Sequence, residues 1–130
     1  MTLRAIALPV LFVLGLSAGT ISFAHHSQSE FDSESTVELN GTVTELVWKS
    51  PHAWIYMDVV DEGGEVVNWG FELPSPTTLM RRGWSRKSLE PGDQITVTGA
   101  PARNHPGIGL ARTVIDADGN GVFTGITDVN

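Results

Sequence analysis

Apolar and polar side chains alternate along three consecutive stretches of the chain, and this alternation constrains the fold more than any other feature. The stretches run over residues 36–48, 53–60 and 65–73. A period of two residues is typical of β-strands that bury one face. Segments rich in turn residues, 49–52 and 61–64, separate them. The sequence therefore predicts a meander of three antiparallel strands, the first of them bent near Gly41.

The same alternation assigns side chains to the two faces of the predicted strands. The inward set on the second and third strands is Ala53, Ile55, Met57, Val59, Val67, Trp69, Phe71 and Leu73. Acidic side chains on the strands, such as Glu38, Glu45 and Glu72, are expected to face solvent.

A short helix and two further strands follow the meander. Ser75 suits an N-cap and Pro76 the first helical position, which predicts a helix over residues 77–82. Residues 94–99 and 108–115 have the composition of a fourth and a fifth strand. This order of elements predicts a mainly β fold, a small five-stranded OB-like barrel over residues 36–130 with one short helix between strands 3 and 4. An open α+β sandwich of the same elements is the alternative.

Residues 1–24 have the features of a secretory signal peptide. Arg4 precedes the uncharged stretch 5–16, and Ser22 and Ala24 fit the small residues that signal peptidase requires. An uncleaved membrane anchor is the alternative, but glycine, serine and threonine shorten the apolar run below about 20 residues. We expect cleavage after Ala24, a flexible N-terminal arm over residues 25–35, and no stable membrane span in the mature protein.

Net charge and cysteine content limit the compartments and the classes of partner that we expect. The net charge is -7, and loss of Arg4 with the leader makes it -8. An acidic surface repels phosphate backbones, so nucleic acid is not an expected partner. The chain has no cysteine, which excludes disulfides and thiolate metal sites. We expect a periplasmic protein whose partner is a small ligand or another periplasmic protein.

Several segments together carry a resemblance to a known family. They are AHHS at 24–27, Phe31-Asp32, LNGTVTELVW at 39–48, SPHAWIY at 50–56, VNWGFEL at 67–73, RRGWSRKSLEPGD at 81–93 and VTGAPAR at 97–103. With these segments the chain resembles exported bacterial proteins of domain of unknown function 6152. The resemblance implies export and no particular chemistry.

Histidines at the predicted mature terminus suggest a metal site. His25 would supply an α-amine and an imidazole, a pair suited to Cu(II), and His26 and His52 could complete a square-planar set. An extended arm of eleven residues could span the first strand at about 3.3 Å per residue. The alternative is that His25 and His26 are solvated and His52 fixes its turn. Copper is the one cofactor that the sequence suggests.

An aromatic face is a second candidate site. Trp54 and Tyr56 have the parity opposite to the core of the second strand, and Trp48 precedes them. In OB-type barrels this face binds ligands between loops that here hold His52 and His105. Alternatively, the arm with Phe31 or the C-terminal tail with Phe123 covers these rings as ordinary packing.

Two further segments contain charged residues in recognisable patterns. Residues 116–121 match the first half of a calcium loop, but position 12 is Thr127 and lacks a carboxylate, which favours a plain turn. The basic residues Arg81, Arg82, Arg86 and Lys87 either complement the end of the helix or contact an acidic partner.

The sequence contains none of the nucleophile, phosphate-loop or metalloprotease motifs of enzymes. The expected function is therefore that of a non-enzymatic periplasmic binding module for a small ligand, metal ion or partner protein. The alternative is a mononuclear copper-binding protein, a carrier or a redox enzyme, that uses its N-terminal histidine.

Overall fold

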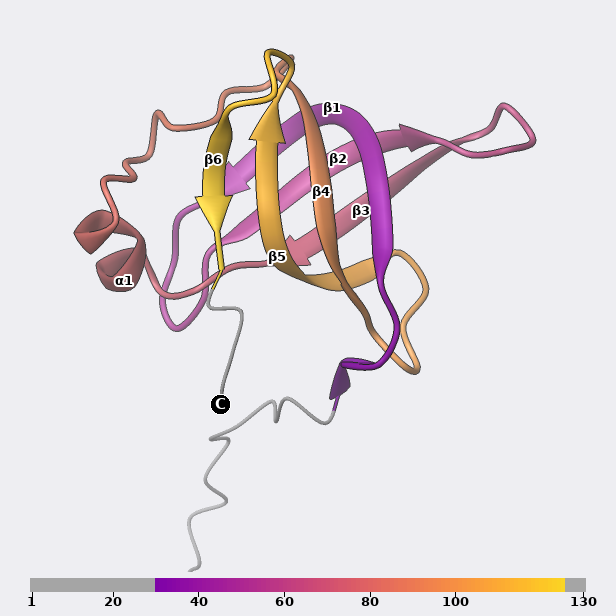
Figure 1. Cartoon of the computed structure of the whole chain (residues 1–130), viewed down its shortest axis with the longest axis horizontal. Helices are drawn as coiled ribbons and strands as arrows, with labels where there is room; N and C mark the ends of the chain where they lie inside the picture. The colour runs from indigo at the N-terminus through magenta and orange to yellow at the C-terminus, as the bar shows by residue number, and fades with distance from the viewer. Residues whose placement is uncertain (1–29, 126–130) are drawn as a thin grey trace, which may run out of the picture.

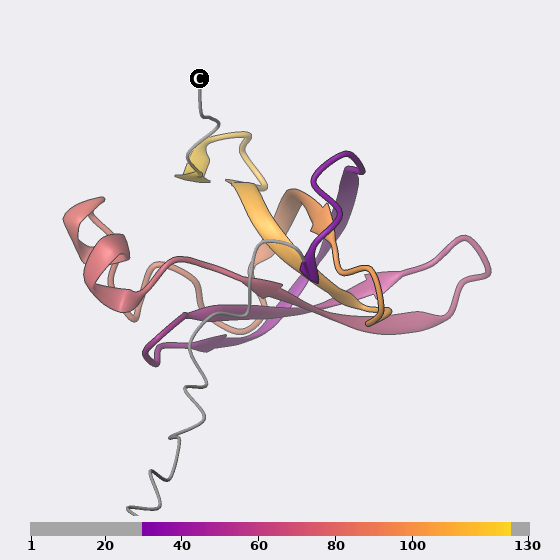
Figure 2. The same ribbon diagram turned by 90° about the horizontal axis from the view of Figure 1, so that it is seen from below.

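The structure, a computed structural model, describes residues 30–125. Its elements, in chain order, are β1 (Val37–Val47), β2 (Trp54–Val60), β3 (Val66–Glu72), α1 (Pro76–Arg81), β4 (Gln94–Pro101), β5 (Ile108–Asp116) and β6 (Gly121–Thr124). The strands curl around one another, and α1 lies at the side opposite to the tip of the β2–β3 hairpin (Figures 1 and 2).

The pairing of the strands closes a barrel. β1 pairs with both β2 and β4, β5 pairs with β4, and β3 joins β5 in parallel where Gly70 lies opposite Ile108. This arrangement confirms the predicted five-stranded barrel with a helix between the third and fourth strands. An additional strand, β6, pairs with the second half of β5. The sequence did not predict β6, because four residues behind an Asp- and Gly-rich turn give too short a pattern to recognise.

β1 is long and pairs with two neighbouring strands. Residues 37–42 pair with β4 and residues 42–47 with β2, and the register shifts between Val43 and Glu45. At the change of partner a Cβ on Gly41 would overlap the carbonyl oxygen of Asp58. Glycine is therefore required where β1 bends, as the sequence predicted.

The core follows the predicted alternation closely on β2. The largest fully buried side chains of the core are Phe71, Ile55, Met57, Leu73, Leu79, Val43, Val97 and Val114. On β3 the prediction is wrong at Val67, which is 37% exposed, and Trp69 is only half-buried. Both residues lie toward the tip of the hairpin, which projects beyond the barrel and has no second layer to cover it (Figure 1).

Helix α1 begins at its predicted cap and seals part of the barrel. The Ser75 hydroxyl accepts a hydrogen bond from the Thr78 amide at 3.3 Å, and Pro76 occupies the first turn. Leu79 is fully buried in the core. Within the described residues, no helix has the length and apolar content needed to cross a membrane.

The last part of the predicted arm packs on the barrel. Phe31 is 5% exposed and forms a β-bridge with Ala102, and the Asp32 amide donates to the Pro101 carbonyl at 2.8 Å. Residues 30–32 thus pair with the end of β4 and the residues that follow it. The predicted signal peptide and residues 25–29 of the arm lie outside the described residues.

Candidate functional site

A cavity of about 520 Å³ lies where the arm, the β1–β2 loop, β3, α1, β4, β5 and β6 meet. Its apolar lining includes Phe31, Leu73, Ala100, Leu110, Ala111 and Phe123. Its polar lining includes Ser33, His52, Glu72, Thr78, Arg82 and Arg112. The volume falls within the range of small-molecule sites, about 300 to 1,000 Å³, and the mixed lining is typical of them. We call this space the main cavity.

His52 and Glu72 form the polar centre of the main cavity. The Leu73 amide donates to the Ala53 carbonyl at 2.9 Å, which extends the β2–β3 pairing and holds His52 beside the end of β3. His52 Nδ1 lies 2.5 Å from Glu72 Oε1. A carboxylate at this atom fixes the neutral ring with its proton on Nδ1 and leaves Nε2 as an acceptor. The pair therefore presents a basic nitrogen of defined orientation.

Glu72 corrects the expectation that the acids on the strands face solvent. It is 8% exposed and is the one buried charged residue between residues 30 and 125. Glu72 lies opposite Trp54 in the β2–β3 ladder, so it points away from the barrel core, as predicted from parity. Neighbouring segments that the alternation does not reveal cover that face. Glu38 and Glu45 are exposed, as expected.

Two arginines border the main cavity. Arg112 Nη1 donates to Thr36 Oγ1 and Nη2 to the Ser33 carbonyl, both at 2.8 Å. Arg82 Nη1 donates to the Thr124 carbonyl at 3.0 Å, and its guanidinium carbon lies 5.7 Å from the centre of the Phe123 ring. These contacts hold both side chains in place through neutral acceptors.

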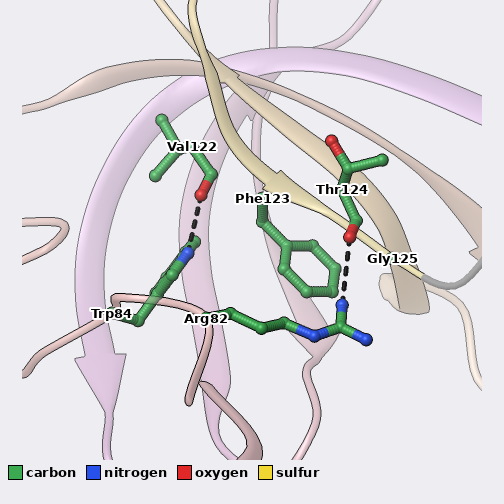
Figure 3. A pocket seen from close by; sticks show the side chains of 6 residues that line it. All are labelled: Arg82, Trp84, Val122, Phe123, Thr124 and Gly125. Atoms are coloured by element: carbon green, nitrogen blue, oxygen red, sulfur yellow. Dashed lines mark hydrogen bonds between the residues drawn. The ribbon is translucent and has the colours of Figure 1, made fainter. Parts of the chain in front are cut away.

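A smaller cavity of about 330 Å³ adjoins the main one and shares Arg82, Phe123 and Gly125 with it. Figure 3 shows Arg82 reaching below Phe123 to the end of β6, and the Trp84 indole bound to the Val122 carbonyl. Most of the polar groups drawn there bind one another. The smaller cavity is therefore a packing gap between β6 and the segment after α1.

Side chains of the β4–β5 loop contact acidic residues of the arm. Arg103 pairs with Asp32 at 3.1 Å, and His105 Nε2 lies 3.7 Å from Glu30 Oε1. The pKa of Asp32 is lowered, first by the hydrogen bond that the Ser35 hydroxyl donates to its carboxylate at 2.6 Å. His105, predicted for the ligand face, thus faces the arm.

The predicted aromatic face is assembled in part. The rings of Trp54 and Tyr56 stack with centroids 6.3 Å apart at 17°, and both are half-buried. Trp48 instead packs against the barrel core, and no ring contact joins it to this pair in the described part of the chain. Phe31 and Phe123, the predicted covers, line the main cavity.

Of the three predicted metal ligands, only His52 lies among the described residues; His25 and His26 lie outside them. From residue 30 to residue 125 no group of three His, Cys, Asp or Glu side chains could hold a metal ion. Residues 116–121 form a turn in which Asp116 Oδ1 accepts from the amides of Asp118 and Asn120. The hydrogen bonds from Asn120 lower the pKa of Asp116. The Asp116 carboxylate is thus occupied by hydrogen bonds within its own turn.

The model of the family of unknown function DUF6152 matches residues 14–111. The chain belongs to the DUF6152 family. The resemblance seen in the sequence is thereby confirmed, and the matched range of the DUF6152 family includes His52, Glu72 and Arg82. No curated protein sequence matches the chain.

Two solved structures are similar to it at a TM-score of 0.44. One is the complex of TiaS with an isoleucine transfer RNA and ATP, with 15% identity over 66% of this chain and 19% of that chain. The other is the ZRD-deleted mutant of TiaS in complex with agmatine, with 17% identity over 75% of this chain and 24% of that chain. The chain spans only about a fifth to a quarter of their length, and we draw nothing from their activities.

Proposed function

We propose that this protein is an exported, periplasmic binding module, non-enzymatic, that holds a small ligand in the main cavity. The observation that carries the proposal is the buried Glu72 carboxylate, paired with His52 at the wall of a largely apolar space. Burial of a charge is costly, and proteins keep such groups where they orient a ligand or a reaction. Binding is favoured over catalysis because the sequence carries no nucleophile motif.

Native mass spectrometry of protein exported to the periplasm tests this function. We expect a chain that begins at His25 and carries a small molecule. Leu110→Trp, which places a ring in the main cavity, should abolish the co-purified mass. Val66→Trp, on the exposed tip of the hairpin, is the matched control and should retain it. An intact leader would contradict the proposed export to the periplasm. A molecule retained by Leu110→Trp would show that the main cavity is not where the ligand binds.

A copper protein, carrier or redox enzyme, is the second candidate. The observation that favours it is that Phe31 and His52 line one cavity, so the end of the arm lies near the histidine. His25 lies six positions before Phe31, a reach of about 20 Å. His52 Nδ1 already faces Glu72, which leaves Nε2 for a metal, as in carboxylate–histidine–metal sites. His25 and His26 would supply the remaining ligands.

Copper titration of protein with a verified His25 terminus tests the second candidate. One extra residue before His25 should weaken binding by at least tenfold, because it moves the α-amine away from the imidazole. His52→Gln should do the same if the distant histidine is a ligand. Equal, weak affinity in all three forms would dismiss the copper site.

A further inference from the structure

The charges around the main cavity are opposite in balance to those of the whole chain. The chain has a net charge of -7, yet two arginines and one glutamate line the cavity. The glutamate, Glu72, is paired with His52. The net charge of the chain thus repels a negatively charged molecule, whereas the arginines of the cavity attract it, which is a basis for selectivity.

The end of β6 contacts both arginine residues that line the cavity. Arg82 donates to the carbonyl of Thr124, and the amide of the next residue, Gly125, donates to the backbone carbonyl of Arg112. Neither guanidinium forms an ion pair with a carboxylate in residues 30–125. A guanidinium has five N–H donors, so each arginine keeps donors beyond those that its neutral partners occupy.

From this arrangement we infer that the ligand of the main cavity is a small amphipathic anion, an apolar body carrying a carboxylate or sulfonate, whose charged group binds Arg82 and Arg112. The inference rests on the proposed binding function and names its ligand class. Planar guanidinium groups fit such oxygens with two hydrogen bonds each. The apolar body contacts the rings of Phe31 and Phe123 and the side chain of Leu110. Because neutral contacts already orient the arginines, little side-chain entropy is lost on binding.

A matched pair of fluorescent probes tests the inference. 1-Anilinonaphthalene-8-sulfonate and N-phenyl-1-naphthylamine share their rings and differ by the sulfonate. We expect the full-length mature protein to bind the sulfonate at least tenfold more tightly. Arg82→Gln and Arg112→Gln should each weaken the sulfonate about tenfold, the loss expected for a charged hydrogen bond, and leave the neutral probe within about twofold. Arg86→Gln, which removes an exposed charge outside the cavity, is the control.

The failures of the two proposals are distinguishable. Equal affinity for both probes, unchanged by either arginine substitution, would overturn the anionic ligand and leave an apolar binding module. Weakening of both probes by Arg82→Gln would assign Arg82 a structural role and also overturn the inference. If neither probe saturates, or if Leu110→Trp binds both normally, the main cavity is not a binding site and both proposals fail. Near-ultraviolet circular dichroism of each variant confirms native packing, because the sulfonate also binds loosened folds.

Discussion

The indole N–H of Trp84 donates to the carbonyl of Val122 at 2.6 Å, across 38 positions of sequence. The next residue, Phe123, meets the same indole edge-on with ring centroids 5.9 Å apart and is 3% exposed (Figure 3). These contacts dock β6 against the segment that follows α1. β6 therefore belongs to the packed domain, and it carries one wall of the main cavity.

Phe123→Ala should lower the free energy of unfolding by about 3 to 5 kcal/mol, the loss typical of a buried phenylalanine. Urea denaturation followed by circular dichroism measures it. Thr124→Ala is the control: its side chain is exposed and only its carbonyl binds Arg82, so the change should stay within about 0.5 kcal/mol. A cost below about 1 kcal/mol for Phe123→Ala would mean that β6 is not docked.

His52 should carry its proton on Nδ1 when the ring is neutral, because that nitrogen faces Glu72. Long-range ¹H–¹⁵N spectra at pH 8 distinguish the two tautomers. His105 provides the comparison within the same protein, since its Nε2 faces Glu30. A neutral His52 ring protonated on Nε2 would contradict the geometry of the pair and remove the nitrogen that the copper candidate needs as a ligand.

Asp32 should titrate below its ordinary value of 3.8, because the Ser35 hydroxyl and the Arg103 charge favour its ionised form. A lowered pKa in the folded protein contributes stability above about pH 4, and this contribution disappears as the pH falls through the folded value. Carbon-13 titration of Ser35→Ala should show the midpoint moving upward toward 3.8. Ser33→Ala, whose hydroxyl is not bound to Asp32, should leave it in place; an equal midpoint in all three proteins would refute the assignment.

The barrel could be predicted because period-two alternation and turn chemistry act over a few residues. Ile55 and Met57 lie where their parity requires, and Ser75 caps α1 as its position suggests. The main cavity could not be predicted in the same way. Glu72 has the parity of a solvent-facing residue and is buried by segments distant in sequence. Arg112 lies on β5, where the register shift between Thr98 and Gly99 interrupts the regular pairing with β4 that alternation alone would predict.

Gly41→Ala should destabilise the barrel, because the new methyl group would overlap the Asp58 carbonyl oxygen and lie 2.6 Å from Met57 Cε. The methionine tip can move, but the carbonyl belongs to the strand that pairs with this part of β1. We expect a loss of about 1 to 3 kcal/mol, as for other overpacked sites. Thermal unfolding should show it as a fall in Tm of several degrees.

Gly121→Ala is the matched control for this substitution. Its Cβ would lie 3.9 Å from Thr124 Oγ1, an ordinary contact, so the free energy of unfolding should change by less than about 0.5 kcal/mol. If Gly41→Ala is tolerated equally well, β1 does not approach β2 as closely as the structure shows. The bend that lets β1 pair with both β2 and β4 would then need another cause, because it would not depend on the missing side chain at Gly41.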